Sequence, residues 1–159
     1  MPTDLERLQT IGFANAGHWS VSGDVLVYEL NARFVTVRNA LYAFVANDRV
    51  MYIGKSTQPL RNRIDNYKYA TRSTNIKNKT NILEHLSRGT RVEIYVLPDN
   101  GLLHYGGFHV NLAAGLEDSL IRDLNPPWNG GKKELPDEDL VPIDPLATAD
   151  GSSTSKGAV

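Results

Sequence analysis

The order of apolar and polar residues along the chain predicts short strands and amphipathic helices. After a short helix at residues 4–10, the runs HWSVSG and DVLVYEL flank Gly23-Asp24 and predict a small hairpin. ALYAFVA and RVMYIG predict a second hairpin, with Asn47-Asp48 at its tip. The alternating run RVEIYVL predicts a further strand, and residues 101–109 predict a loop or a hairpin.

Three more helices follow from apolar positions spaced three and four residues apart. The first begins near Pro59, because proline suits the first helical turn. The residues on its inner face are Leu60, Arg63, Ile64 and Tyr67. Residues 76–88 predict a second helix that stops at Gly89, and residues 111–124 predict the clearest one. Pro126-Pro127 ends this last helix, since proline cannot continue it.

These elements predict an α/β (α+β) fold in which helices flank a small three-stranded antiparallel sheet. The three strands are expected at residues 40–46, 50–54 and 91–97. Residues 1–37 form an N-terminal extension of one helix and one hairpin, and residues 38–133 form the main domain. Residues 134–159 are poor in apolar side chains, contain several prolines and end in GSSTSKGAV, which predicts a disordered tail.

The composition is that of an ordinary globular domain, with 159 residues, 41% hydrophobic and 22% charged. The absence of cysteine excludes disulfides, thiolate metal sites and a cysteine nucleophile. The longest apolar runs are too short to span a bilayer, and the N-terminus lacks the basic-then-apolar order of a signal peptide. We therefore expect a cytoplasmic protein that does not bind membranes.

The formal net charge of −1 hides an uneven distribution of charge. Nine Lys or Arg and only two acids lie between Lys55 and Arg91, whereas six acids and one lysine follow Lys133. A basic central third indicates a surface that faces phosphate groups, and a merely solvated basic face explains the charge equally well.

Several polar side chains occupy positions where the pattern expects apolar ones. Glu117 lies in the stripe of the 111–124 helix, so it needs a metal, an arginine or a hydrogen-bond cluster, unless it reaches water at the edge of the stripe. Arg63 and Tyr67, four residues apart, share one helix face, which suits a functional pair and a snorkelling arginine beside a half-buried tyrosine equally well. Tyr42 and Tyr52 sit in the second hairpin, where each buried hydroxyl needs a partner.

The order and spacing of these residues resemble the signature of the GIY-YIG nuclease family. Ala40-Leu41-Tyr42 is followed after nine residues by Tyr52-Ile53-Gly54, and then by Lys55 and LRNRI. The later pattern E-x-x-L-I-x-x-L-x-P-x-W-N runs from Glu117 to Asn129. The resemblance covers about residues 38–131. It departs from the family at Ala-Leu-Tyr, which stands in place of Gly-Ile-Tyr.

The resemblance implies a DNA endonuclease that depends on Mg²⁺, with Mn²⁺ as a substitute, and that leaves 5′-phosphate and 3′-hydroxyl ends on double-stranded DNA. The catalytic residues it implies are Tyr42, Tyr52, Lys55, Arg63, Tyr67, Glu117 and Asn129. Glu117 is the only carboxylate expected on an inward face near the motif, which favours a single metal ion held by Glu117. Tyr42 is expected to activate the attacking water, with its pKa lowered by Lys55, Arg63 and the metal.

Nucleic-acid contacts are expected from the basic residues Lys55, Arg61, Lys68, Arg72, Lys77 and Lys79. The stretch ATRSTNIKNKTN suits either a loop that grips backbone phosphates or a solvated linker. His104 and His109 flank a glycine pair but lack a third metal ligand in the sequence nearby. The alternative function is a nucleic-acid-binding or partner-targeted regulatory module with weak or no nuclease activity. Restriction, repair, mobile-element and phage-defence roles all fit, as do a monomer and a homodimer.

Overall fold

The computed structural model describes residues 1–130, which fall into two compact units. The first unit is Met1–Trp128, and the second begins at Asn129. The tail predicted at residues 134–159 lies outside the described residues. Within the described range, no helix is both long and apolar enough to cross a bilayer.

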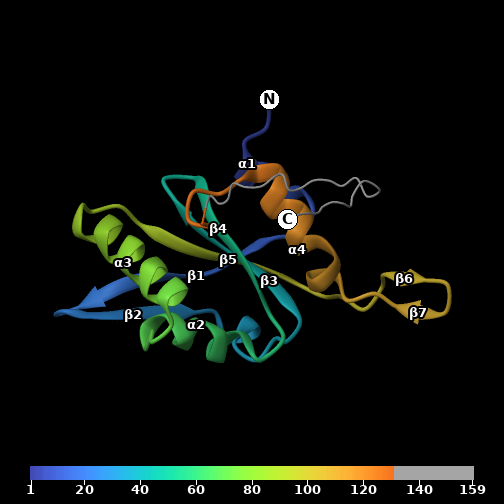
Figure 1. The fold of residues 1–159 in the computed structure, drawn as a ribbon, viewed down its shortest axis with the longest axis horizontal. Coiled ribbons are helices and arrows are strands. Elements are labelled where there is room, and N and C mark those ends of the chain that lie inside the picture. Colours follow the sequence, from blue (N-terminus) through green and yellow to red (C-terminus); the bar gives the residue numbers. More distant parts are fainter. Residues whose placement is uncertain (131–159) are drawn as a thin grey trace, which may run out of the picture. The chain divides into compact units, whose positions relative to one another are not determined.

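The first unit is built on one antiparallel sheet of five strands (Figure 1), in the order β2-β1-β5-β3-β4. The strands are β1 (Ala14–Ser22), β2 (Val25–Leu30), β3 (Ala40–Ala46), β4 (Arg49–Ser56) and β5 (Val92–Pro98). The predicted sheet of three strands is therefore too small. The N-terminal hairpin joins it because β1 pairs with the free edge of β5, with Trp19 opposite Val92. Residues 1–37 thus contribute two strands to the sheet that contains the predicted strands.

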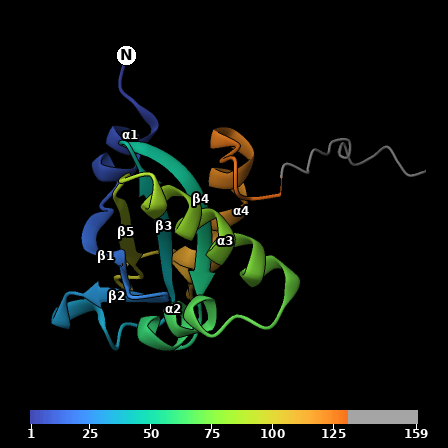
Figure 2. The same cartoon turned by 90° about the vertical axis from the view of Figure 1, so that its left-hand side faces the viewer.

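Helices cover both faces of this sheet (Figures 1 and 2). On one face lie α2 (Leu60–Lys68) and α3 (Ser73–Ser87), and on the other lie α1 (Asp4–Thr10) and α4 (Leu112–Leu124). Side chains of β3 alternate between the two layers. Ala40, Tyr42, Phe44 and Ala46 pack under α2 and α3, whereas Leu41, Ala43 and Val45 pack under α1 and α4. Two-sided burial explains why the whole of β3 is buried.

The β3–β4 hairpin turns at Asn47-Asp48, as predicted. Both residues have positive φ, 52° and 60°, which is the requirement of the two-residue turn that matches strand twist. A further small hairpin, β6 (His104–Tyr105) with β7 (Phe108–His109), lies between β5 and α4. The 3-10 helix η1 (Ala32–Phe34) links β2 to β3.

The start of α3 and the end of α4 can be compared with the predicted helix boundaries. The start of α3 is Ser73, three residues before the predicted start, so most of ATRSTNIKNKTN is helical and not a loop or linker. The end of α4 follows the prediction: Asn125 adopts the left-handed conformation (φ 48°) directly before Pro126-Pro127. The backbone N–H of Trp128 then donates to the Met51 carbonyl of β4 at 2.8 Å, which covers part of this edge strand.

Candidate active site

Three charged side chains from three elements meet near the end of the edge strand β4. Lys55 ends in an ammonium group 3.7 Å from a carboxylate oxygen of Glu117 on α4. The Glu117 side chain is 24% exposed, so it is neither on the solvent surface nor in the core. Burial raises the pKa of Glu117, and the charges of Lys55 and Arg63 counteract that rise. Glu117, the glutamate in the apolar stripe of α4, therefore lies beside Lys55 and within electrostatic range of Arg63.

Arg63 of α2 lies over two tyrosine rings, Tyr67 of the same helix and Tyr42 of β3. Its guanidinium carbon lies 4.8 Å from the centre of the Tyr67 ring and 5.8 Å from that of Tyr42. Both distances lie within the range of cation–π attraction. Burial lowers the pKa of Arg63, but the neighbouring tyrosines outweigh this and raise it. Arg63 therefore stays protonated, with its guanidinium group over the two rings.

Tyr42 and Tyr67 share a hydrogen bond between their hydroxyl oxygens, 2.6 Å apart, in the core between β3 and α2. Neither side chain has an exposed surface. Burial raises the pKa of Tyr42 far more than Arg63 and the Tyr67 hydrogen bond lower it. Arg63 thus lowers the Tyr42 pKa as expected, but burial outweighs this effect and the net shift is upward. The Tyr52 side chain is partly exposed, which distinguishes it from Tyr42 and Tyr67.

Gly54 is required by the position of the Tyr42 ring. The two residues lie opposite one another in the β3–β4 ladder. A Cβ at position 54 would lie 2.5 Å from the Tyr42 hydroxyl oxygen and 2.6 Å from its Cζ. Because Tyr42 is wedged between the sheet and α2, its ring cannot move aside.

Gly54→Ala should lower the free energy of unfolding by about 1–3 kcal/mol, the usual cost of overpacking a core. Gly107→Ala is the matched control, because a Cβ there meets nothing within 4 Å. Urea denaturation of both variants measures the difference. Equal stability of the two variants would show that the Tyr42 ring is not held against Gly54.

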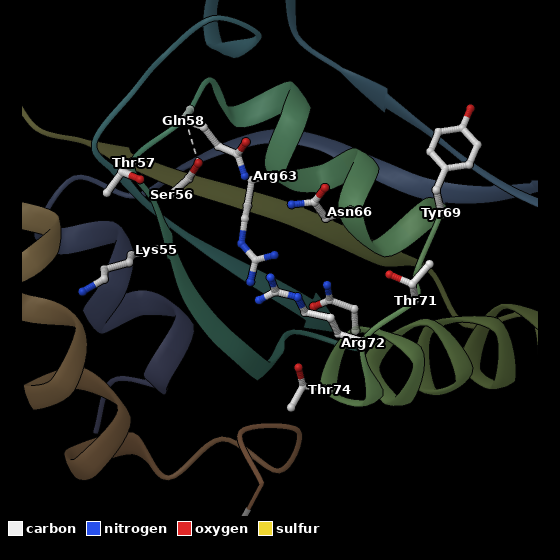
Figure 3. Close-up of a pocket in the computed structure, with 11 residues that line it drawn as sticks. Lys55, Ser56, Thr57, Gln58, Arg63, Asn66, Tyr69, Thr71, Arg72 and Thr74 are labelled. Atoms are coloured by element: carbon white, nitrogen blue, oxygen red, sulfur yellow. Dashed lines mark hydrogen bonds between the residues drawn. The ribbon is translucent and has the colours of Figure 1, made fainter.

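The basic residues predicted to bind nucleic acid separate into groups. Lys55 and Arg72 line one cavity together with Arg63 (Figure 3). Arg61 and Lys68 line a different hollow, which also contains Tyr28 and Asp65.

The remaining predicted site residues lie apart from that cavity. Lys77 is exposed on α3. The Lys79 amine donates to the Lys68 carbonyl at 3.0 Å and so ties α3 to the end of α2. Asn129 belongs to the second unit, so its place relative to the others is not described. Sequence reasoning missed the uncharged residues that line the cavity, among them Asn66, Thr71 and Asn75. For Thr71 and Asn75 the only available signal was the polar stretch of residues 70–81.

Glu117 is the side chain best suited to hold a divalent metal. The neighbouring acids of α4 are engaged elsewhere, since Asp118 pairs with Arg122 and Asp123 pairs with Arg7. Among residues 1–130 there is no group of three or more His, Asp or Glu that could hold a metal. A site with one carboxylate fits Mg²⁺, which keeps several waters and takes its other ligands from substrate phosphates. It does not fit Zn²⁺, which needs three or four protein ligands.

Comparison with known proteins bears on the family to which this chain belongs. No family model matches the chain. Endonuclease II of Enterobacteria phage T4 is 36% identical over 101 residues, which cover 57% of this chain and 71% of that protein. The chain belongs to the GIY-YIG nuclease family. The resemblance inferred from Tyr42, Tyr52, Arg63 and Glu117 is thereby confirmed at the level of the family.

Two solved structures of GIY-YIG nucleases were compared with this fold. A mutant of bacteriophage T4 EndoII has a TM-score of 0.62 at 23% identity, over 80% of this chain and 99% of that one. The restriction endonuclease Hpy188I in complex with product DNA has a TM-score of 0.45 at 16% identity, over 76% of this chain and 80% of that one. The first comparison supports the α+β fold with its five-stranded antiparallel sheet.

Proposed function

We propose that this GIY-YIG nuclease is a Mg²⁺-dependent endonuclease of double-stranded DNA. It hydrolyses phosphodiester bonds to 5′-phosphate and 3′-hydroxyl ends, and Mn²⁺ can replace Mg²⁺. The observation that carries the proposal is the approach of one half-buried carboxylate, Glu117, to Lys55 at 3.7 Å, with Arg63 in the adjacent basic cavity. The homology to an endonuclease supports the same reaction class.

The cationic side chains bind and polarise the DNA phosphate. Arg63, which stays protonated, donates to the scissile phosphate and stabilises charge that builds up in the transition state. Lys55 bridges this position and Glu117, so it can contact the same phosphate. Glu117 holds the metal ion, which when bound supplies charge neutralisation and lowers the pKa of coordinated water. For Asn129 the sequence motif alone supports a role, and we propose that it positions groups without taking part in the chemistry.

The three tyrosines assist the attack of water by orienting the reacting groups. Tyr42 keeps its proton, because burial raises its pKa. Its hydroxyl holds Tyr67, and both rings hold Arg63. Tyr52 is the tyrosine of the three that reaches solvent, and so it is the one that can hydrogen-bond to the attacking water. Tyr42 and Tyr67 are positioning residues in this proposal.

Tyr42→Phe should slow single-turnover cleavage by about ten- to a hundredfold, as expected when a reacting group is misplaced. It should also destabilise the fold by about 1–3 kcal/mol, since the Tyr67 hydroxyl loses its buried partner. The rate should keep the pH dependence of the parent, because a positioning residue does not titrate in the working range. Loss of the alkaline rise in rate would instead identify Tyr42 as the general base.

Nicking of supercoiled plasmid by the purified protein tests the proposed function. Relaxed circles should appear with Mg²⁺ or Mn²⁺ and not with EDTA. Ligation of the nicks by DNA ligase without prior end treatment checks for the 5′-phosphate and 3′-hydroxyl ends. DNA binding without nicking in either metal would favour the binding-module alternative.

A further inference from the structure

A cavity of about 470 Å³ opens between the end of β4, α2 and the start of α3 (Figure 3). Three of its lining residues are basic, Lys55, Arg63 and Arg72, and none is acidic. The other lining side chains are amides, hydroxyls and one phenol, Asn66, Thr71 and Asn75 among them. A hollow with this lining offers hydrogen-bond donors and positive charge, with almost no apolar surface.

The two arginines of the cavity point toward one another. Figure 3 shows the Arg63 side chain descending from α2 and the Arg72 side chain reaching toward it from the start of α3. Neither arginine forms an ion pair with a carboxylate within residues 1–130. Like charges that converge repel one another, and an anion between them removes that repulsion. The arrangement is therefore complete only with an anionic ligand.

We propose that this cavity binds a second phosphate of the cut DNA strand, next to the scissile one, with Arg72 as its principal ligand. The inference rests on the proposed nuclease function and adds a binding step to it. Arg63 lies between the two phosphate positions, since it contacts the Tyr42 and Tyr67 rings and also lines the cavity. Lys55 points away from Arg72 toward α4, on the side of the scissile phosphate (Figure 3).

The chemistry of the lining fits a phosphodiester better than a base or a sugar alone. A planar guanidinium donates two parallel hydrogen bonds to a phosphate, and amides and hydroxyls supply neutral donors around it. Phosphate contacts fix the register of a strand without reading its sequence. The second phosphate site therefore anchors the strand on both sides of Arg63 and holds the scissile bond in place.

Binding of two short ligands in EDTA tests the inference without any cleavage. The dinucleotide pdTpdT carries two phosphates, and dTpdT carries one. Their dissociation constants are measured by ¹H–¹⁵N NMR titration, following the arginine Nε–Hε signals and the backbone amides. The native protein should bind pdTpdT at least about tenfold more tightly than dTpdT, the expected gain from charged hydrogen bonds.

Arg72→Ala should bind both ligands with affinities within about twofold of each other, because only the second phosphate loses its ligand. Arg88→Ala, which removes an exposed charge from the far end of the same helix, should keep the preference of the native protein. Unchanged amide shifts in the β3–β4 hairpin check that the Arg72 variant is folded. A native protein that binds neither ligand, or that shows no preference, overturns the inference, and so does an Arg72 variant that keeps the preference.

The outcome is separable from that of the plasmid experiment. If the protein prefers pdTpdT through Arg72 but does not nick plasmid, the second anion site stands and the nuclease assignment falls. If it nicks plasmid but the Arg72 variant keeps the preference, the nuclease assignment stands and the second phosphate site falls.

Discussion

Glu117→Gln should abolish Mg²⁺-dependent nicking, with a loss of at least about a thousandfold in single-turnover rate. The substitution keeps the size of the side chain and removes only the anionic oxygen that would hold the metal. Loss of metal stabilisation is worth several kcal/mol of transition-state energy, and each 1.36 kcal/mol is a factor of ten in rate. Affinity for DNA should stay the same or increase, since a negative charge beside the phosphate is removed and Lys55 loses its partner.

Asp118→Asn is the matched control for this prediction. Asp118 is the next residue on α4, is exposed, and pairs with Arg122 one turn along the helix. An exposed ion pair of this type contributes little to stability, so cleavage should remain within about twofold. Anisotropy with labelled duplex measures affinity in parallel. Substantial Mg²⁺-dependent cleavage by Glu117→Gln would show that the metal is held elsewhere.

The protonation of Glu117 also predicts a pH dependence. A metal ligand must be ionised, and burial raises the pKa of Glu117 despite the nearby Lys55. As the pH is lowered, metal binding should therefore weaken at a higher pH than it would for an exposed glutamate. A Mg²⁺ titration of the cleavage rate at several pH values measures this, and a higher Mg²⁺ concentration should restore the rate.

The pattern of apolar and polar residues predicted local structure well, but it missed a strand pairing between segments far apart in the sequence. The strand at residues 40–46 and the Asn47-Asp48 turn agree with the structure, because alternation and turn chemistry are local properties. The pairing of β1 with β5 joins segments far apart in sequence. Alternation shows that a segment forms a strand, but it does not identify the neighbouring strand. The sheet was therefore predicted with three strands and has five.

In the site, too, the sequence predicted local features but not those that depend on long-range packing. The residue spacing predicted that Arg63 and Tyr67 share one helix face, and it identified Glu117 as unusual. In the structure Arg63 lies over the Tyr67 ring, and Glu117 lies beside Lys55 near the end of β4. The direction of the Tyr42 pKa shift depends on burial between the sheet and α2, which no local pattern reveals. The cavity arises where α2 meets α3, and so Asn66 gave no signal in the sequence that set it apart from other surface residues.

Arg63→Ala should reduce the cleavage rate by about 10²–10³-fold at saturating DNA, because it removes the donor that we propose for the developing phosphate charge. Arg61→Ala is the control two residues away. Arg61 is exposed and lines the hollow with Tyr28 and Asp65, away from the tyrosine pair. Its loss should weaken affinity and lower the salt slope of binding by about one unit, with little effect on the saturated rate.

Arg63→Lys separates charge from geometry at the same position. Lysine keeps the positive charge but lacks the planar fork that stacks on Tyr67 and donates two parallel hydrogen bonds. It should therefore recover DNA affinity and only a small part of the rate. Thermal melting of the three variants controls for loss of packing over the tyrosine rings. If Arg61→Ala lowers the saturated rate more than Arg63→Ala does, Arg61 is the catalytic arginine and the alignment of LRNRI with the family is shifted by two residues. The geometry argues against that outcome, because the Arg63 guanidinium lies over Tyr42 and Tyr67 and lines the cavity that Lys55 shares.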